Sequence, residues 1–460
     1  MALTAANTPA NQGYPGVATN DGQNYATTYA VAAGVVSEWK NPTPLIGMTD
    51  RKLSSDWPST GGSTKPPGDT ITIEKAQRYR VRRGSTFDQQ PNKAETETIQ
   101  FNEPWGVDTG SDMWVPVMFQ SPEDVRRVAA RKTARLLDEV EGDVAREARR
   151  YHRTIGTVHG NSLIAPGSQS TAANPNRGAK LILDEKAYLM KTLGMLRGTK
   201  LCLDPMTGAA MNLDLLNAPY EAPYSGSVRS SGSQSGTRLG VDFKPSIQNG
   251  VQAMGNMASS GAVQVATAPS EGGNTVELKT LTSGTAPAPG TSLSFENTNA
   301  VNRTTGAPTG YRQHFKVVSV AAGGGTTPLV TVDPPFRSAT NGENIRDRNC
   351  TQRPAANAKV YFNDLDTSEV ANRTAYQGKS VDVNFLGLAD TISLTISEAQ
   401  VPPRGVIRGA MIRSAKNKIA MSDTEAYDVL SHSTKHRLDE RHALLNWERE
   451  AGVVILGGEV

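Results

Sequence analysis

The chain has 460 residues, 43 of them glycine and 27 proline, and a formal net charge of +3 with histidine neutral. This length exceeds what one hydrophobic core usually organises, and the glycine and proline content favours strands, turns and extended segments over a helical bundle. The nearly balanced charge argues against a dedicated nucleic-acid binder, so we expect any contact with DNA to be diffuse and confined to one face.

Cysteine content and hydropathy bear on the compartment in which the protein works. Cys202 and Cys350 are too few and too far apart for a metal cluster or a disulfide framework, which indicates a reducing cytoplasm. The first residues lack a basic leader and an apolar signal core, and no apolar run approaches the roughly 20 residues that cross a bilayer. We therefore expect a soluble protein with no membrane partner that stays where it is made.

The first 60 residues are expected to form an N-terminal arm with one short helix. Residues 1–23 are polar and rich in Ala, Asn and Gly, a composition that buries too little surface to order itself. The run from Tyr25 to Trp39 permits a helix, which Pro42 ends because proline lacks a backbone donor and restricts the residue before it. A helix this short needs the support of a neighbour.

A long β-hairpin is predicted after a Gly/Pro/Ser/Thr linker. Thr70–Glu74 alternates polar and apolar residues as a strand does, and a second strand at Thr96–Phe101 closes the hairpin. Between the two strands, a period of two residues places Arg78, Arg80 and Arg82 on one face. An isolated hairpin is marginal in water, so these arginines either line a solvated strand face or pair with acids of a neighbouring copy.

The strongest local signal predicts a long helix over residues 121–156. Ser121 can cap the helix, Pro122 suits its first position, and two acids follow that favour the N-terminal end of the helix dipole. We expect about 35 helical residues, roughly 50 Å long, with Gly156 as the stop. A thin apolar stripe is predicted to pack: Val125, Ala129, Leu136, Val140, Val144, Ala148, Tyr151 and Ile155.

Acidic residues gather in the middle of this helix, at Asp138, Glu139, Glu141 and Asp143. They are either a carboxylate cluster for acid–base work or a hard cation, or solvated charge that serves as a docking site. We favour the second interpretation because the acids surround Gly142 on what is expected to be an exposed helix. Asp138, Glu139 and Glu141 are then candidates for contacts between subunits.

The rest of the chain alternates α/β sequence with a β-rich insertion. A helix near Leu183–Leu196 and a strand at Thr199–Leu203 precede it. The insertion is predicted to be a small β-barrel because four short strands are separated by Gly, Pro and Asn: Thr275–Leu281, Ser292–Glu296, His314–Val320 and Leu329–Val332. After it we expect strands at Val381–Phe385 and Thr391–Ser397, partly helical sequence from Ser422 to Arg437, and the final pair Ala443–Glu448 and Gly452–Leu456.

One histidine pattern could hold a metal. On a helix, the spacing of His432, His436 and Glu440 would align three possible ligands, but neither a fourth ligand nor a zinc motif accompanies them, so a solvated face is the preferred interpretation. We find no nucleophile elbow, no phosphate-binding glycine loop and no recognisable Ser/His/Asp order. We therefore expect neither an enzyme nor a cofactor, and a metal-dependent hydrolase is kept only as an alternative.

Three sequence blocks resemble a known family. Gly290–Asn302, Thr309–Val318 and Leu329–Pro335 are similar, in order and spacing, to the insertion domain of P-twenty-two-type coat proteins, which belong to the major capsid proteins of the Hong Kong 97 fold. The ending Glu440–Gly458 also looks like the last strands of that fold, although the proline common in its turn is absent here. The resemblance covers most of the chain and is weak in the first 60 residues.

The resemblance implies an α+β, Hong Kong 97-like capsid fold with a small inserted all-β barrel. The domains expected from it are an N-terminal arm at 1–60, an extended loop at 61–110, a peripheral domain with the spine helix at 111–180, the first part of an axial domain at 181–268, the inserted barrel at 269–340, and a return to the axial and peripheral domains at 341–460.

The same resemblance implies the function. Copies would self-assemble into hexamers and pentamers of an icosahedral shell that encloses the double-stranded DNA of a tailed phage. The implied partners are other copies, a scaffolding protein, a portal at one vertex, packaged DNA and a decoration protein. The shell would be assembled in the host cytoplasm and remain in the virion. The structural alternative is another virion protein of the tail or decoration type.

Overall fold

The structure is a computed structural model, and its described residues fall into two compact units. Unit 1 comprises 1–73, 96–144 and 392–445, and unit 2 comprises 74–95, 145–391 and 446–460. The described residues are 30–38, 44–50, 70–74, 96–101, 105–112, 122–159, 162–164, 177–193, 198–208, 236–238, 241–255, 259–282, 285–303, 305–321, 327–338, 348–364, 377–388, 391–397, 408–414, 419–428 and 433–459.

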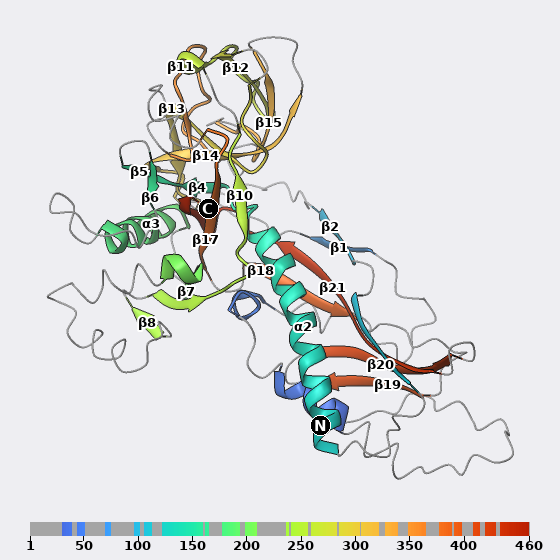
Figure 1. Ribbon diagram of the computed structural model, residues 1–460. Coiled ribbons are helices and arrows are strands. Elements are labelled where there is room, and N and C mark those ends of the chain that lie inside the picture. The colour runs from blue at the N-terminus through green and yellow to red at the C-terminus, as the bar shows by residue number, and fades with distance from the viewer. Residues whose placement is uncertain are drawn as a thin grey trace, which may run out of the picture. The chain divides into compact units, whose positions relative to one another are not determined.

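Unit 1 combines a long helix with a five-stranded sheet. The helix is α2 (Pro122–Ala148), and Figure 1 shows it running along the sheet. The strands are β3 (Trp105–Asp112), β18 (Ile392–Ser397), β19 (Arg408–Ser414), β20 (Ile419–Asp428) and β21 (Ser433–Asn446). Strand β21 is central: its first half pairs antiparallel with β20 on one edge and β3 on the other, and β18 is its neighbour in the sheet order.

The expectation of partly helical sequence from Ser422 to Arg437 is wrong. The described residues of this segment lie in β20 and β21, which pair from Met421↔Glu440 to Asp428↔Ser433. Pairing on both edges satisfies the backbone donors and acceptors of residues 433–440 of β21, and the apolar residues Met421 of β20 and Leu438 of β21 are buried. Sheet context therefore decides the structure of a charged segment whose own preference is weak.

Helix α2 also ends earlier than its apolar stripe suggests. It stops at Ala148, Arg149 and Arg150 form a turn, and Arg153–Ile155 becomes strand β4, which pairs parallel with β22 (Gly452–Glu459). Tyr151 and Ile155 are buried, as the stripe requires. A spacing of four residues keeps one face in a strand as well as in a helix, so the stripe could not locate the change.

The apolar side of α2 forms much of the core of unit 1. Leu136, Val140 and Val144 are buried, whereas Val125 near the start is half-buried. The helical segment 30–38 packs against the same helix through Gly34, where an added Cβ would lie 2.5 Å from the Arg126 carbonyl oxygen. The described part of the expected arm is therefore held by its own chain.

Residues 44–50 continue along unit 1. Leu45 and Ile46 are buried at the 3-10 helix η1 (Ile46–Met48), and the Leu45 amide donates to Glu141 Oε1 at 3.2 Å. Asp50 forms a parallel bridge with Ser393 of β18.

The predicted hairpin strands are confirmed, and its arginine row lies outside the described residues. β1 (Thr70–Glu74) and β2 (Thr96–Gln100) form a two-stranded sheet. Residues 75–95, which carry Arg78, Arg80 and Arg82, are outside the described ranges.

Unit 2 contains a seven-stranded sheet and helix α3 (Arg177–Leu193). The strand order is β4-β22-β17-β7-β9-β8, and β10 pairs with one end of β17. The strands not yet bounded are β7 (Thr199–Leu203), β8 (Gly236–Arg238), β9 (Val241–Pro245), β10 (Val251–Ala253) and β17 (Ser380–Leu388). Ile182 and Leu189 of α3 share a core with Leu201, Phe243 and Val453 of the sheet. A two-stranded sheet of β5 (Thr157–His159) and β6 (Ser162–Ile164) follows β4 in the chain.

A second, six-stranded sheet of unit 2 nearly closes on itself. Its order is β11-β12-β15-β14-β13-β16, and the bridge Gln264↔Lys359 joins β11 to the segment leading into β16. The strands are β11 (Ser259–Val265), β12 (Thr275–Leu281), β13 (Ser292–Val301), β14 (Pro308–Ala321), β15 (Leu329–Asp333) and β16 (Val360–Phe362). Phe295, Phe315 and Phe336 pack inside it with ring centroids 4.4–5.8 Å apart.

The chain is thus mixed α+β and rich in sheet. All four strands predicted for the insertion are present, with β13 and β14 longer than expected. The two units are interleaved along the sequence. The boundaries of the six expected domains stay predictions. Among the described helices, none is long and apolar enough to cross a membrane.

Gly34 gives a test of the contact between segment 30–38 and α2. We expect Gly34→Ala to lower the free energy of unfolding by about 1–3 kcal/mol, because the new methyl group would meet backbone that cannot move away easily. The matched control is Gly261→Ala, where an added Cβ has nothing within 4 Å. Urea unfolding of both variants checks this, and equal effects would show that Gly34 is not a close contact.

Candidate functional site: a buried arginine joint between two sheets

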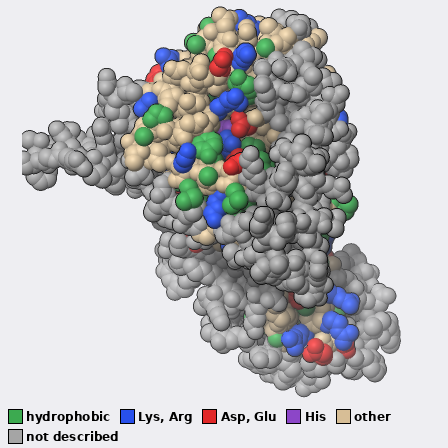
Figure 2. Space-filling view, turned by 90° about the vertical axis from the view of Figure 1, so that its left-hand side faces the viewer, with side chains coloured by type: hydrophobic (Ala, Val, Ile, Leu, Met, Phe, Trp, Pro, Cys, Tyr) green, Lys and Arg blue, Asp and Glu red, His purple; other side chains and the backbone are tan. Residues whose placement is uncertain are grey.

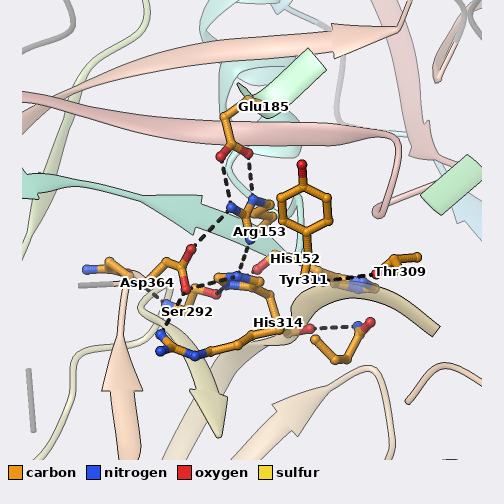
Figure 3. Close-up of polar contacts among 11 residues, drawn as sticks. His152, Arg153, Glu185, Ser292, Thr309, Tyr311, His314 and Asp364 are labelled. Carbon is orange, nitrogen blue, oxygen red and sulfur yellow. Dashed lines mark hydrogen bonds and ion pairs between the residues drawn. The ribbon is translucent and has the colours of Figure 1, made fainter. Parts of the chain in front are cut away.

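Strand β4 contacts both large sheets of unit 2. It pairs with β22 at one edge of the seven-stranded sheet, and it also contacts β13 and β14 of the six-stranded sheet. Helix α3 contacts β14 as well. Figure 3 shows the polar side chains that meet at this position, which we call the arginine joint: His152, Arg153, Glu185, Ser292, His314 and Asp364.

Arg153 is the centre of the joint and is only 4% exposed. Its Nε and Nη2 donate to the two carboxylate oxygens of Glu185 at 2.5 and 2.8 Å, and Nη2 also donates to Asp364 Oδ2 at 3.2 Å. The guanidinium lies 4.2 Å from the ring centroid of Tyr188. Burial alone would lower the pKa of Arg153, but the charges of Glu185 and Asp364 outweigh it and hold the pKa above its ordinary value.

His314 completes the set of acceptors around this guanidinium. Its Nε2 lies within hydrogen-bond distance of Arg153 Nη1, and a guanidinium has only donors, so Nε2 must carry a lone pair. The proton is then on Nδ1, which donates to Ser292 Oγ at 3.0 Å, and the Ser292 hydroxyl donates to the His152 carbonyl at 2.9 Å. Burial, reinforced by the charge of Arg153, keeps the pKa of His314 well below its usual value.

A second basic group of β14 is also held close to neutrality. Lys316 is buried, and its Nζ donates to Thr154 Oγ1 of β4 at 2.5 Å. Burial, with a smaller effect from the charge of Arg149, lowers the pKa of Lys316 to about 7. The contact between the two sheets therefore requires one neutral histidine and favours a neutral lysine.

Further polar contacts extend the joint along both sheets. Asp333 of β15 accepts from His152 Nε2 at 3.2 Å and from Arg449 Nη1 at 2.6 Å. Burial would raise the pKa of Asp333, but these hydrogen bonds and charges lower it far below its usual value. In the turn after β13, Arg303 Nε donates to Glu450 Oε2 at 2.5 Å, and the Arg303 amide donates to the Thr192 carbonyl near the end of α3 at 3.0 Å.

The chemistry of the joint is structural. Apart from His152 Nδ1, which is buried without a hydrogen-bond partner among the described residues, its hydrogen-bonding groups are directed at one another. Breaking one of these bonds would leave a polar atom in the protein interior without its partner. Side chains from β4, α3, β13, β14 and the residues after β16 are thereby held in one arrangement. The joint fixes the nearly closed sheet on the seven-stranded sheet.

The residues singled out from the sequence lie elsewhere. Asp138 and Glu139 of α2 are half-buried, and Glu139 accepts from Arg135 at 3.0 Å. The expectation of solvated charge is wrong for Glu141 and Asp143, which are 3% and 4% exposed and hydrogen-bonded inside unit 1. The docking role of Asp138 and Glu139 stays a prediction.

The histidine pattern does not form the ligand set that a helix would give. His436 and Glu440 lie on strand β21, where four residues span roughly 13 Å, too far to share one ion. Glu440 is buried against His442, and His432 is outside the described residues. In the described part of the chain, no group of three or more His, Cys, Asp and Glu residues could hold a metal ion.

Sequence reasoning missed the arginine joint, although one signal was present. His314 and Lys316 alternate with Phe315 and Val317 in β14, and all four side chains are buried. Polar and apolar residues on opposite faces normally indicate a half-buried strand. A histidine and a lysine in a strand that forms contacts on both faces would have indicated a buried polar network.

Comparison with known proteins gives solved structures only. No family model matches the sequence, and no curated protein matches it significantly. A structure from Mycobacterium phage Che8 is similar over 90% of this chain and 90% of that chain, with 9% identity and a TM-score of 0.39. The mature capsid of bacteriophage PhiM1 is similar over 90% and 87%, with 10% identity and a TM-score of 0.40. The CUS-3 coat protein I-domain is similar over 23% of this chain and 97% of that chain, with 20% identity and a TM-score of 0.18.

The buried pair of Arg153 and Glu185 gives a test of the joint. We expect Glu185→Gln to lower the free energy of unfolding of unit 2 by about 3 kcal/mol, because the buried guanidinium loses its main counter-charge. The matched control is Glu139→Gln, which breaks an ion pair whose side chains are 65% and 41% exposed and should cost no more than about 0.5 kcal/mol. Urea unfolding measures both, and equal costs would contradict the joint.

Lys316 gives a pH-dependent test. Because its pKa is about 7 in the fold and 10.5 in the unfolded chain, the unfolded chain binds more protons between these values. Lys316 should therefore make the stability of unit 2 rise with pH between pH 7 and about 9, by up to about 1.4 kcal/mol per pH unit. At higher pH the raised pKa values of Cys350, Tyr151 and Tyr188 act in the opposite direction. Lys316→Met should remove that slope and be more stable than the parent at pH 7. Urea unfolding at several pH values measures this slope. If the stability of Lys316→Met depends on pH as strongly as that of the parent, the assignment to Lys316 is contradicted.

Proposed function

We propose that this chain is the major capsid protein of a tailed phage, with a Hong Kong 97-like fold and an inserted barrel. One observation carries the proposal. The three sequence blocks that resemble the insertion domain of the P-twenty-two type build the adjacent strands β13, β14 and β15. Adjacent strands of one sheet are what blocks from a single domain should form. In chain order, the sheet lies between β10 and β17, two strands of the seven-stranded sheet that pair with each other.

The architecture of each unit supports the remaining domain assignments. A 27-residue helix along a sheet, as in unit 1, fits a peripheral domain with its spine helix. The seven-stranded sheet with α3 in unit 2 fits an axial domain, and the β1–β2 pair fits an extended loop. The resemblance assigns residues 1–60 to the arm and 269–340 to the inserted barrel, and the second range holds β12 to β15, the four central strands of the six-stranded sheet.

Assembly is proposed to complete the parts that one chain leaves marginal. A two-stranded hairpin has little stability by itself, and the row of Arg78, Arg80 and Arg82 gives it charges that acids of a neighbouring copy can pair bidentately. Asp138 and Glu139 on α2 are candidates for such acids. Repeated head-to-tail contacts close rings, which gives hexamers and pentamers, and binding of neighbours then stabilises each subunit by mass action.

Further partners follow from a shell that holds a genome. We propose a scaffolding protein, a portal at one vertex, a decoration protein and packaged double-stranded DNA as partners, and the virion as the location. On the face drawn in Figure 2, basic and acidic side chains are interspersed among the described residues, which fits a diffuse contact with DNA.

Assembly of the full chain tests the proposed function. Expressed with the scaffolding candidate from its own genome, the chain should give closed shells or free capsomers in electron micrographs and fast-sedimenting material on gradients. Tubes would favour a tail protein instead. A chain that remains monomeric under these conditions would overturn the proposal.

The hairpin arginines give a residue-level test of the same function. Arg80→Glu should leave the monomer folded, by circular dichroism, and abolish assembly, because the reversed charge repels the acids of the neighbour. Arg80→Lys is the matched control: it keeps the charge but loses bidentate pairing, so it should assemble more weakly than the parent. Normal shells from Arg80→Glu would remove the arginine row from the interface.

A further inference from the structure

A second buried charge cluster lies in unit 1 and has no part in the arginine joint. His442 and Glu440 of β21 are fully buried, and Asp143 of α2 is 4% exposed. His442 Nε2 lies 3.1 Å from Asp143 Oδ2, and His442 Nδ1 lies 3.2 Å from Glu440 Oε2. One imidazole therefore bridges a carboxylate of the helix and a carboxylate of the strand.

The geometry specifies the protonation state of this imidazole. An ionised carboxylate only accepts hydrogen bonds, so each ring nitrogen that faces one must carry a proton. His442 is therefore the imidazolium. A neutral ring would turn one lone pair toward a buried carboxylate and leave two negative charges in the interior without the cation they share.

The charges around this cluster come from a few described elements. The charge interactions that act on His442 come from Glu440 and Asp143. Strand β18, next to β21 in the sheet, has no titratable side chain. Other charged groups of the neighbouring elements interact elsewhere. Lys132 of α2 feels the charges of Asp423 and Asp108, and Glu141 of α2 accepts from the Leu45 amide. Arg437 pairs with Asp439, and Arg441 lies over the ring of Phe101.

We propose that His442 is a proton-operated latch between α2 and β21. While protonated, it holds Asp143 of the helix to Glu440 of the strand. When it loses its proton, the two buried carboxylates repel each other, and the C-terminal half of α2 in unit 1 separates from the sheet. The latch is a property of the single chain, so it does not depend on the proposed function.

The direction of the pH response follows from the two states of the imidazole. Burial lowers the pKa of His442, but the charges and hydrogen bonds of Glu440 and Asp143 outweigh it and raise the pKa from 6.5 to about 9. The stabilisation is therefore complete below pH 6.5 and is lost as the pH rises through about 9. The arginine joint of unit 2 has the opposite requirement, because His314 and Lys316 are held neutral or close to it.

Hydrogen exchange of the purified full chain tests the latch in both units at once. After correction for the intrinsic exchange rate, peptides from 136–144 of α2 and 441–445 of β21 should open roughly tenfold more per pH unit between pH 6.5 and about 9. Peptides from β14 in unit 2 serve as an internal reference and should not open more over the same range. A flat response in α2 and β21 would overturn the proposal.

Three variants separate the latch from a general effect of pH. In His442→Gln, the peptides of α2 and β21 should open more than in the parent at pH 6.5, and their opening should not increase further with pH. The matched control His436→Gln changes a histidine of the same strand outside the cluster and should keep the parental response. If His442→Gln does not fold, Asp143→Asn retains the side-chain volume and should lower the pH at which α2 opens. A parental response in both His442→Gln and Asp143→Asn would exclude the latch.

Discussion

The need to satisfy one buried guanidinium organises unit 2. Arg153 is almost completely removed from water, so its donors must find acceptors within the protein. Those acceptors come from α3, from β14 and from the residues after β16, through Glu185, His314 and Asp364. Because a planar guanidinium accepts little distortion, these segments can only meet in one arrangement. The orientation of the nearly closed sheet on the seven-stranded sheet therefore depends on a single side chain of the short strand β4.

Unit 1 solves a similar problem with a different ion. There the buried carboxylates belong to α2 and β21, and the cation between them is His442. A histidine can lose its charge at a pH at which an arginine remains charged. Both units thus place a buried cation between elements that also pack through apolar side chains, and removing one partner would leave a buried charge uncompensated. Arg153 of unit 2 keeps its charge at every ordinary pH, whereas His442 of unit 1 can lose its charge. Only the connection through Arg153 therefore keeps its cation when the pH rises.

Many of the strands of this fold could be predicted from the sequence, but the end of helix α2 and the polar contacts between distant segments could not. Strands such as Thr199–Leu203 and Thr275–Leu281 were bounded correctly, because alternation and flanking turn residues are local signals. The end of α2 was missed because Tyr151 and Ile155 share a face in a helix and in a strand. The arginine joint could not be predicted, since Arg153 and Glu185 are brought together only after two sheets pack. Glu141 was misjudged for the same reason: its partner is the backbone of residue 45.

A rigid interior in each unit is what a shell subunit requires. If identical copies are to form both five-fold and six-fold rings, the difference in geometry between the two rings must be accommodated at contacts between copies or at a few defined points within each copy. Close-packed cores deform little, and the buried polar joints described above resist sliding further. Adjustment is then left, under the proposed function, to the contacts between copies, such as those of the β1–β2 hairpin with its neighbours. Under the proposed function, a subunit that is stiff in its sheets and marginal in its hairpin acquires its final stability from its neighbours.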